Sequence, residues 1–255
     1  MEFFDSHAHY NDERFESNKY ELIEEMYNDE ITRIVCAGYN VKSSIEAIEI
    51  ANKYEHVFAI VGISPNDIQD YNVENLNKIE MLAKDNKKVV AIGEIWLDYY
   101  WEKENKDLQN ELFSKQIDIA NLLELPIVIH SRDAVMDTLD MIKNKNKVIK
   151  KGIFHCCQLN PELIKEAVKQ GFYISFSGNV TFKNAKAKEA IELVPLDRIL
   201  IETDSPYLSP EPFRGKTNTS LNVKLVAKKI AEVLDMKIED IARITYENAN
   251  RIFNI

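Results

Sequence analysis

Residues 89–95 read VVAIGEI and residues 126–130 read PIVIH. Both stretches are apolar at almost every position instead of alternating with polar residues, which is expected for strands that are covered on both faces. Such strands are typical of parallel sheets in α/β proteins, where helices pack on the sheet. The two stretches therefore predict a parallel α/β fold.

The same kind of segment recurs along the chain, separated by amphipathic stretches with helical spacing. The predicted strands are residues 3–9, 31–38, 57–64, 89–96, 126–131, 152–157, 172–178 and 198–204. The predicted helices are residues 20–28, 43–54, 73–85, 105–123, 134–143, 161–169, 184–193, 222–234 and 238–252. Eight such units favour a (β/α)₈ barrel of the TIM type, with an open doubly wound sheet as the alternative. Residues 1–255 contain no linker-like segment, dinucleotide fingerprint or P-loop, so we expect a single barrel domain.

The composition is that of a globular protein with an acidic surface. The net charge of −10 argues against a broad basic face that coats nucleic acid, although a few local cations can still bind phosphates. No apolar run approaches the roughly 20 residues of a membrane span, and the N-terminal segment has no signal-peptide pattern. We therefore expect a cytoplasmic protein with no membrane contact and no obligate protein partner.

The chain has three cysteines, Cys36, Cys156 and Cys157. They are too few for a disulfide framework and fit a reducing compartment. The adjacent pair could bind one zinc ion only at a break in a strand, because neighbouring side chains on a strand point to opposite faces.

Side chains of the metal-binding type lie where the predicted strands end. They are His7 and His9 on the first strand, Glu94 on the fourth, His130 on the fifth, His155 on the sixth and Asp204 on the eighth. The C-terminal ends of barrel strands share one mouth, where the active sites of this fold lie. Each residue alone could be structural, but five strand ends that carry such side chains predict a common site. His56 precedes the third strand, at the opposite end, and we expect it at the surface.

His7 and His9 are two positions apart on a strand, so both can point into the mouth. Imidazoles and carboxylates suit divalent ions, and six donors exceed the four that one tetrahedral ion needs. We therefore expect two ions with Glu94 between them, and zinc, manganese, magnesium, iron and nickel are all compatible with these donors. Two ions about 3.5–4 Å apart can activate water and stabilise charge on a phosphoryl centre.

These segments resemble the TatD-type deoxyribonucleases, within the amidohydrolase-like group of metal-dependent barrels. The matching segments are FDSHAHY (4–10), AIGEIWLDYY (91–100), PIVIHSRDA (126–134), IFHC (153–156), ILIETDSPYLSP (199–210), FRGK (213–216) and TYENANRIF (245–253). The resemblance implies a barrel with two divalent ions that hydrolyses DNA phosphodiesters, typically by removing nucleotides from a 3′ end. One ion would be held by His7, His9, Glu94 and Asp204, and the other by Glu94, His130 and His155. Asp204 would also accept the proton of the attacking water.

The resemblance further implies that Arg132, Arg214 and Lys216 contact phosphate. Each has an alternative: Arg132 could pair with the neighbouring Asp133, and Arg214 and Lys216 could lie on a solvated loop. The aromatic residues at positions 99 and 100 could stack on a base or pack the loop that carries them.

The chain departs from the family pattern around the predicted substrate. Ser64 stands where the family commonly has a histidine that is associated with phosphate contact, and a serine cannot supply a positive charge. Trp96 stands where glycine is usual, and its ring either narrows the mouth or offers a stacking surface. Residues 156–159 and 217–220 differ as well, and the second segment loses one positive and one negative charge.

The observations predict a metal-dependent deoxyribonuclease that acts on single-stranded DNA or 3′ ends, with Glu94 and Asp204 as catalytic residues and Ser64 and Trp96 beside the substrate. The altered surroundings leave open a metal-dependent ester or amide hydrolase, such as a D-aminoacyl-tRNA deacylase or a small-molecule amidohydrolase. A non-catalytic binding protein is the third alternative, and the complete donor set argues against it.

Overall fold

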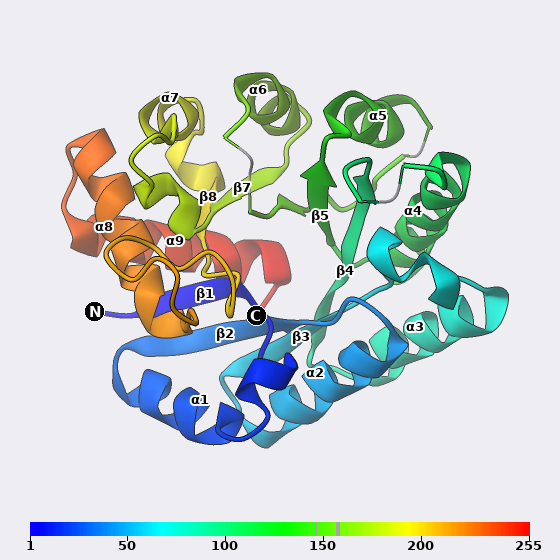
Figure 1. Ribbon diagram of the computed structural model, residues 1–255, viewed down its shortest axis with the longest axis horizontal. Coiled ribbons are helices and arrows are strands. Elements are labelled where there is room, and N and C mark those ends of the chain that lie inside the picture. The colour runs from blue at the N-terminus through cyan, green and yellow to red at the C-terminus, as the bar shows by residue number, and fades with distance from the viewer. Residues whose placement is uncertain (102, 146, 157–158) are drawn as a thin grey trace.

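The computed structural model describes residues 1–101, 103–145, 147–156 and 159–255, and its eight strands form one parallel sheet in chain order. The strands are β1 (Phe3–Ala8), β2 (Ile31–Ala37), β3 (Val57–Val61), β4 (Val89–Asp98), β5 (Ile127–Arg132), β6 (Ile153–Phe154), β7 (Tyr173–Phe176) and β8 (Ile199–Ile201). The sheet curves into a near-closed barrel with the helices on its outside (Figure 1). The prediction of a TIM-like (β/α)₈ barrel is confirmed.

The helices lie between the strands and after the last one. They are α1 (Lys19–Asn28), α2 (Val41–Lys53), α3 (Val73–Asp85), α4 (Lys106–Leu122), α5 (Val135–Asp140), α6 (Pro161–Lys169), α7 (Ala187–Glu192), α8 (Val223–Leu234) and α9 (Ile238–Phe253). Local chemistry sets where they begin: the Asn40 side chain accepts from the Ser43 amide, and the Ser43 hydroxyl accepts from the Asn40 amide, both at 2.9 Å. In the described ranges, no helix is long and apolar enough to cross a bilayer.

Most elements differ from the predicted bounds by one to three residues at an end, and three differences have a clear local cause. β4 continues two residues further, to Asp98, because its last residues pair in register with β5 as far as Arg132. The predicted helix at residues 134–143 ends as α5 at Asp140 and continues as a π-helical turn. β6 stops at Phe154, because Cys156 has a left-handed backbone (φ 43°) that a strand cannot contain. The alternative of a zinc ion at the cysteine pair involves Cys157, which lies outside the described residues.

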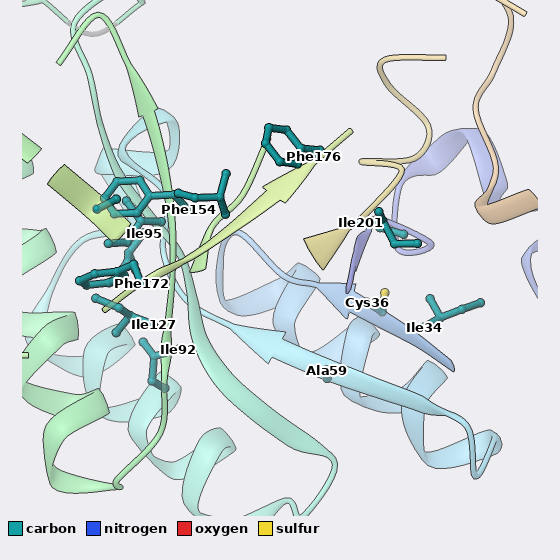
Figure 2. Packing of buried hydrophobic residues seen from close by; sticks show 14 of the residues in the cluster. Ile34, Cys36, Ala59, Ile92, Ile95, Ile127, Phe154, Phe172, Phe176 and Ile201 are labelled. Carbon is teal, nitrogen blue, oxygen red and sulfur yellow. The ribbon is translucent and has the colours of Figure 1, made fainter. Parts of the chain in front are cut away.

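Two buried apolar clusters hold the barrel together. One contains a residue from each strand, such as Phe4, Ile60, Val128 and Leu200, and reaches Phe253 of α9. Residues from all eight strands can meet only inside the barrel, so this cluster fills the interior. The larger cluster lies between the strands and the surrounding helices. Part of it appears in Figure 2, where aromatic and isoleucine side chains from β4 to β7 gather together.

His56 is half-buried, which corrects the expectation of a surface position. It precedes β3, and its ring packs against Tyr27 with 4.2 Å between centroids. Burial, with the nearby Lys88 ammonium, lowers the pKa of His56, which fits a neutral packing residue.

The seam between β1 and β8 closes the barrel through a few specific hydrogen bonds. A single parallel bridge joins Ala8 to Ser205. The His9 amide donates to the Ser205 carbonyl at 2.7 Å, and the Asp204 amide donates to the His7 carbonyl at 2.9 Å. The Ser6 hydroxyl donates to the Ile201 carbonyl at 2.9 Å. Three residues of the predicted metal site therefore lie on the two sides of this seam.

Asp5 is the buried polar centre of the seam. Its carboxylate accepts from the amides of His7 (3.3 Å) and Thr203 (2.9 Å) and from the hydroxyls of Thr203 and Ser220, each at 2.5 Å. Burial raises the pKa of Asp5 to about 7, although these four hydrogen bonds favour the charged form. Asp5 thus connects β1 both to the end of β8 and to the segment that leads into α8.

We predict that Asp5→Ala will lower the free energy of unfolding by about 3 kcal/mol or more, because several buried donors lose their acceptor. Asp5→Asn should lose clearly less, since it keeps an acceptor oxygen for the two amides and has no charge to bury. Urea unfolding of both variants at pH 7.5 tests this. An equal loss in the two variants would contradict a role that depends on the accepted hydrogen bonds.

Candidate metal centre

Six side chains from five strand ends meet in the mouth of the barrel. His7, His9, Glu94, His155 and Asp204 are buried, and His130 is partly buried. The Glu94 carboxylate is the centre of the group. Its Oε2 lies 3.5 Å from Nε2 of both His7 and His9, and its Oε1 lies 2.5 Å from Nε2 of His155. Asp204 Oδ1 lies 3.4 Å from His9 Nε2.

The donors form overlapping groups that share Glu94. Within 4.8 Å of one another lie the ligand atoms of His7, His9 and Glu94, and likewise those of Glu94, His130 and His155. A third such group, His7, His155 and Asp204, connects the first two. Glu94 is common to the first two groups, whereas the third combines donors from both of the sets that the family resemblance implies.

The spacing of the imidazoles fits shared divalent ions. Two ligand atoms about 2.0–2.1 Å from one tetrahedral ion lie about 3.3–3.4 Å apart. The Nε2 atoms of His7 and His9 are 3.3 Å apart, and His130 Nδ1 is 3.1 Å from His155 Nε2. In both pairs one ring nitrogen faces another ring nitrogen, at the separation expected for two ligands of one ion. The donor set and its spacing therefore suit cations.

The electrostatics keep most of these donors ready to bind. Burial and the neighbouring His155 lower the pKa of His130 to about 4, so its ring is neutral at physiological pH. Burial opposes ionisation of Glu94, yet His155 and His7 hold its pKa well below the usual range. Burial also disfavours the charged form of His155, but Glu94 and the nearby Glu202 raise its pKa well above the usual value. A bound cation would take the place of that proton.

Glu202 is a site residue that the strand-end argument missed. It is fully buried, and its Oε1 accepts from the Cys156 amide at 2.5 Å and lies 3.4 Å from His155 Nδ1. A carboxylate at the far nitrogen of a ligating histidine fixes which nitrogen carries the proton. The signal was in the sequence: Glu202 precedes Asp204 by two positions, the same spacing that singled out the two histidines of β1.

Three of the residues predicted to contact substrate line the mouth. Ser64, Trp96 and Arg132 border a cavity of about 410 Å³ together with five of the six donors. Trp96 is buried, and its ring stands edge-on to His130 with centroids 5.4 Å apart. Its position narrows the mouth beside Glu94. The Ser64 hydroxyl donates to the Asp67 carboxylate at 2.7 Å, so a carboxylate borders the mouth at this point.

Arg132 has no carboxylate partner in the part of the chain that the structure describes, and a pair with Asp133 is not formed. Its guanidinium lies over the rings of Tyr100 (4.5 Å to the centroid) and Trp101 (5.5 Å) instead. Tyr99 packs the loop, because its hydroxyl donates to Asp137 at 2.7 Å. The positive charge of Arg132 is therefore available at the edge of the cavity.

Arg214 and Lys216 are exposed on the loop after β8, and neither lines the cavity. The Arg214 guanidinium lies 4.3 Å from the Phe182 ring centroid. Residues 217–220 do not form a substrate loop in this structure. Asn218 is buried and donates to the carbonyls of Thr203 (2.9 Å) and Tyr207 (2.7 Å), and Ser220 donates to Asp5, so the segment supports the seam.

Comparison with known proteins agrees with this geometry. The family model described as TatD related DNase matches residues 4–254. The chain belongs to this family. It is 45% identical over 253 residues to the uncharacterized metal-dependent hydrolase YabD of Bacillus subtilis, covering 99% of both chains. It is 36% identical over 264 residues to the uncharacterized metal-dependent hydrolase YcfH of Escherichia coli, covering all of this chain and 97% of that one.

The fold is also similar to that of solved structures. The TatD homolog YJJV of Escherichia coli has a TM-score of 0.94 and 22% identity, with 99% of this chain and 98% of that chain covered. A TatD family hydrolase of Entamoeba histolytica has a TM-score of 0.84 and 21% identity, with 99% and 98% covered. The recognition of a TatD-type barrel is confirmed, and the chain is a metal-dependent hydrolase of this family.

We predict that zinc or manganese will raise the melting temperature of metal-free protein, because an ion that binds the folded state adds about 2.7 kcal/mol at a hundredfold excess over Kd. Glu94→Gln should lose most of this shift, since the amide removes a charge that both donor groups share. Scanning calorimetry and elemental analysis measure the two effects. Exposed Glu247 of α9 gives the control Glu247→Gln, and an unchanged shift in Glu94→Gln would refute the shared role.

We predict that Glu202→Gln will weaken metal affinity about 10–100-fold, because the ring of His155 loses the charge that orients it. Competition with a chromophoric chelator measures the affinity. The metal-free variant should unfold no more readily than the wild type, since a buried charge is removed while an acceptor for the Cys156 amide remains. Glu211→Gln, on the exposed loop after β8, is the matched control. A loss of folding stability without a loss of affinity would show that Glu202 is merely structural.

Proposed function

We propose that this chain is a deoxyribonuclease that uses two divalent ions to remove nucleotides from 3′ ends of unpaired DNA. The observation that carries the proposal is the Glu94 carboxylate shared between two histidine groups, with the guanidinium of Arg132, which has no carboxylate partner among the described residues, at the edge of the same cavity. The match of almost the whole chain to a family described as TatD related DNase supports the same substrate.

The metal donors, Asp204 and Arg132 have separate roles in this reaction. Ions bound at these donors would polarise water and offset negative charge on the phosphate. Asp204, at the cavity wall beside His9, is placed to accept the proton of the attacking water. Arg132 can form paired hydrogen bonds to phosphate oxygens, as a planar guanidinium does. Because the protein carries a net charge of −10, the positive charge of Arg132 contributes more to phosphate binding than it would on a basic surface.

The shape of the mouth suits the end of a polymer. A second cleft of about 490 Å³ adjoins the metal cavity, and Tyr39 and Tyr207 line both. A strand end could occupy the metal cavity, with further room beside it in the neighbouring cleft. A buried, closed pocket would favour a small molecule instead.

A second candidate function has a specific observation in its favour. Ser64 and Asp67 border the mouth where the family commonly has a histidine, so this wall carries negative charge. A carboxylate there suits a substrate with an amino group better than it suits a second phosphate. This favours hydrolysis of esters or amides, such as the ester of a D-aminoacyl-tRNA.

We predict that metal-loaded protein will shorten 5′-labelled single-stranded DNA from its 3′ end and that Asp204→Asn will abolish this activity. Arg132→Ala should raise KM for the oligonucleotide about tenfold or more, because a charge-assisted contact is lost. Its effect on a neutral ester substrate should be small. Product ladders on gels and initial rates measure both effects.

The control is Arg243→Ala, an exposed arginine of α9 that forms an ion pair with Glu247. Turnover of aminoacyl esters without any DNA cleavage, across zinc, manganese, magnesium, iron and nickel, would replace the leading proposal by the second one.

A further inference from the structure

Two aromatic residues stand in solvent beside the mouth. Tyr100 and Trp101 lie two and three residues after the end of β4, and they are 46% and 63% exposed. Their rings meet edge to face, with centroids 4.7 Å apart and planes at 90°. With the guanidinium of Arg132 over both rings, they form what we term the aromatic platform. A tryptophan with most of its surface in water needs an explanation other than core packing.

Buried polar groups hold the platform in place. The carboxylate of Asp98, which is 1% exposed, accepts from the amides of Tyr100 and Trp101 at 2.8 Å each. The buried side chain of Gln109 in α4 accepts from the Asp98 amide (2.9 Å) and donates to the Asp98 carbonyl (3.1 Å). The turn is thus fixed on both sides. The exposed rings are presented by an ordered support and are not the tip of an unsupported loop.

The platform is continuous with the metal cavity through Arg132. This residue pairs in register with Asp98 across β4 and β5, and it lines the cavity together with Glu94 and His130. Its guanidinium lies over both exposed rings, and the same residue lines the cavity that holds the donors. It has no carboxylate partner in the described ranges. A ligand that reaches from the donors to the rings therefore passes metal-type side chains, a cation and two ring surfaces.

We propose that the aromatic platform binds a nucleobase of the unpaired substrate strand, while Arg132 contacts the phosphate between that base and the reacting bond. The inference rests on the proposed nuclease function and deepens it. Ring faces stack on any base, so the site is tolerant of sequence. A duplex hides the faces of its bases, so the platform selects unpaired ends. Two side chains are too little surface for a stable protein interface, which buries about 1,200 Å² or more.

The test compares Trp101→Ala, Tyr100→Ala and the wild type on single-stranded oligonucleotides. In a second set of substrates, an abasic tetrahydrofuran unit replaces one base at a time, at each of the last four positions. At one position, loss of the base should raise wild-type KM about tenfold, and Trp101→Ala should show a similar loss on the intact strand. On the strand that is abasic at that position, the KM of Trp101→Ala should be little higher than that of the wild type, because the substitution and the missing base remove the same contact.

Two further variants separate stacking from folding. Trp101→Phe keeps a ring and should recover most of the affinity. Tyr27→Ala removes a 48% exposed aromatic of α1 that packs on His56, at the other end of the barrel, and should leave KM unchanged. Binding of a fluorescein-labelled oligonucleotide to the metal-free proteins, followed by anisotropy, gives a readout that does not depend on turnover.

Three results would overturn the inference. The first is an equal ratio of KM for abasic and intact strands in the wild type and in Trp101→Ala, at every position tested. The second is a dimer that Trp101→Ala converts to a monomer with base discrimination unchanged, which would make the platform an interface between copies. The third is a wild-type protein that neither binds nor cleaves any oligonucleotide while it hydrolyses esters. Only the third also removes the proposed nuclease function.

Discussion

The structure depends on the closure of β1 against β8 around the buried carboxylate of Asp5. The strands meet there through one bridge and a few individual hydrogen bonds. Asp5 accepts two of these from Thr203, and it also accepts from His7 of its own strand and from Ser220 ahead of α8. His7 and His9 lie on one side of this seam and Asp204 on the other. The donor cluster can exist only when the seam is closed, so the stability of the fold and the geometry of the site have a common physical cause.

The second constraint is electrostatic. Glu94, Asp204 and Glu202 place three carboxylates among four imidazoles in a largely buried volume. Buried carboxylates cost free energy unless positive charge offsets them. Without ions, positive charge comes from two histidines whose pKa values rise in spite of burial: His155, through Glu94 and Glu202, and His9, through Asp204 and Glu94. Divalent cations meet the same requirement with more charge, which explains why the fold tolerates such a cluster.

Much of the site could be predicted because strand alternation and barrel topology are general rules that do not depend on individual side-chain contacts. A donor at a strand end must face the common mouth, so six residues spread from His7 to Asp204 were placed together without knowledge of any contact. Glu202 was missed because only Asp204, at the end of the predicted strand, was counted as a donor, and the burial of Glu202 beside His155 depends on a contact between distant segments. The burial of Asn218 within residues 217–220 could not be predicted, because a position on a loop does not reveal which side chains point inward.

Other features could not be read from the sequence because they depend on packing between distant segments. From the sequence, Arg132 could contact phosphate or pair with Asp133. Its contact with the aromatic rings depends on the turn that Asp98 fixes. Arg214 lies over Phe182, away from the cavity, for the same kind of reason. The fold rule fixes which end of the barrel a residue occupies, but not the direction of a long side chain.

The seam also has a consequence for the order of events during synthesis. Asp5 is separated from its partners Thr203 and Ser220 by 198 and 215 residues. At about 5–20 residues per second, a ribosome needs roughly 10–40 s to supply them after Asp5 has been made. During that interval the two histidines and the carboxylate of β1 lack the partners that residues 203–220 supply in the folded protein. The nascent chain must therefore keep its first strand from engaging stray metal ions or neighbouring strands until its last strand arrives.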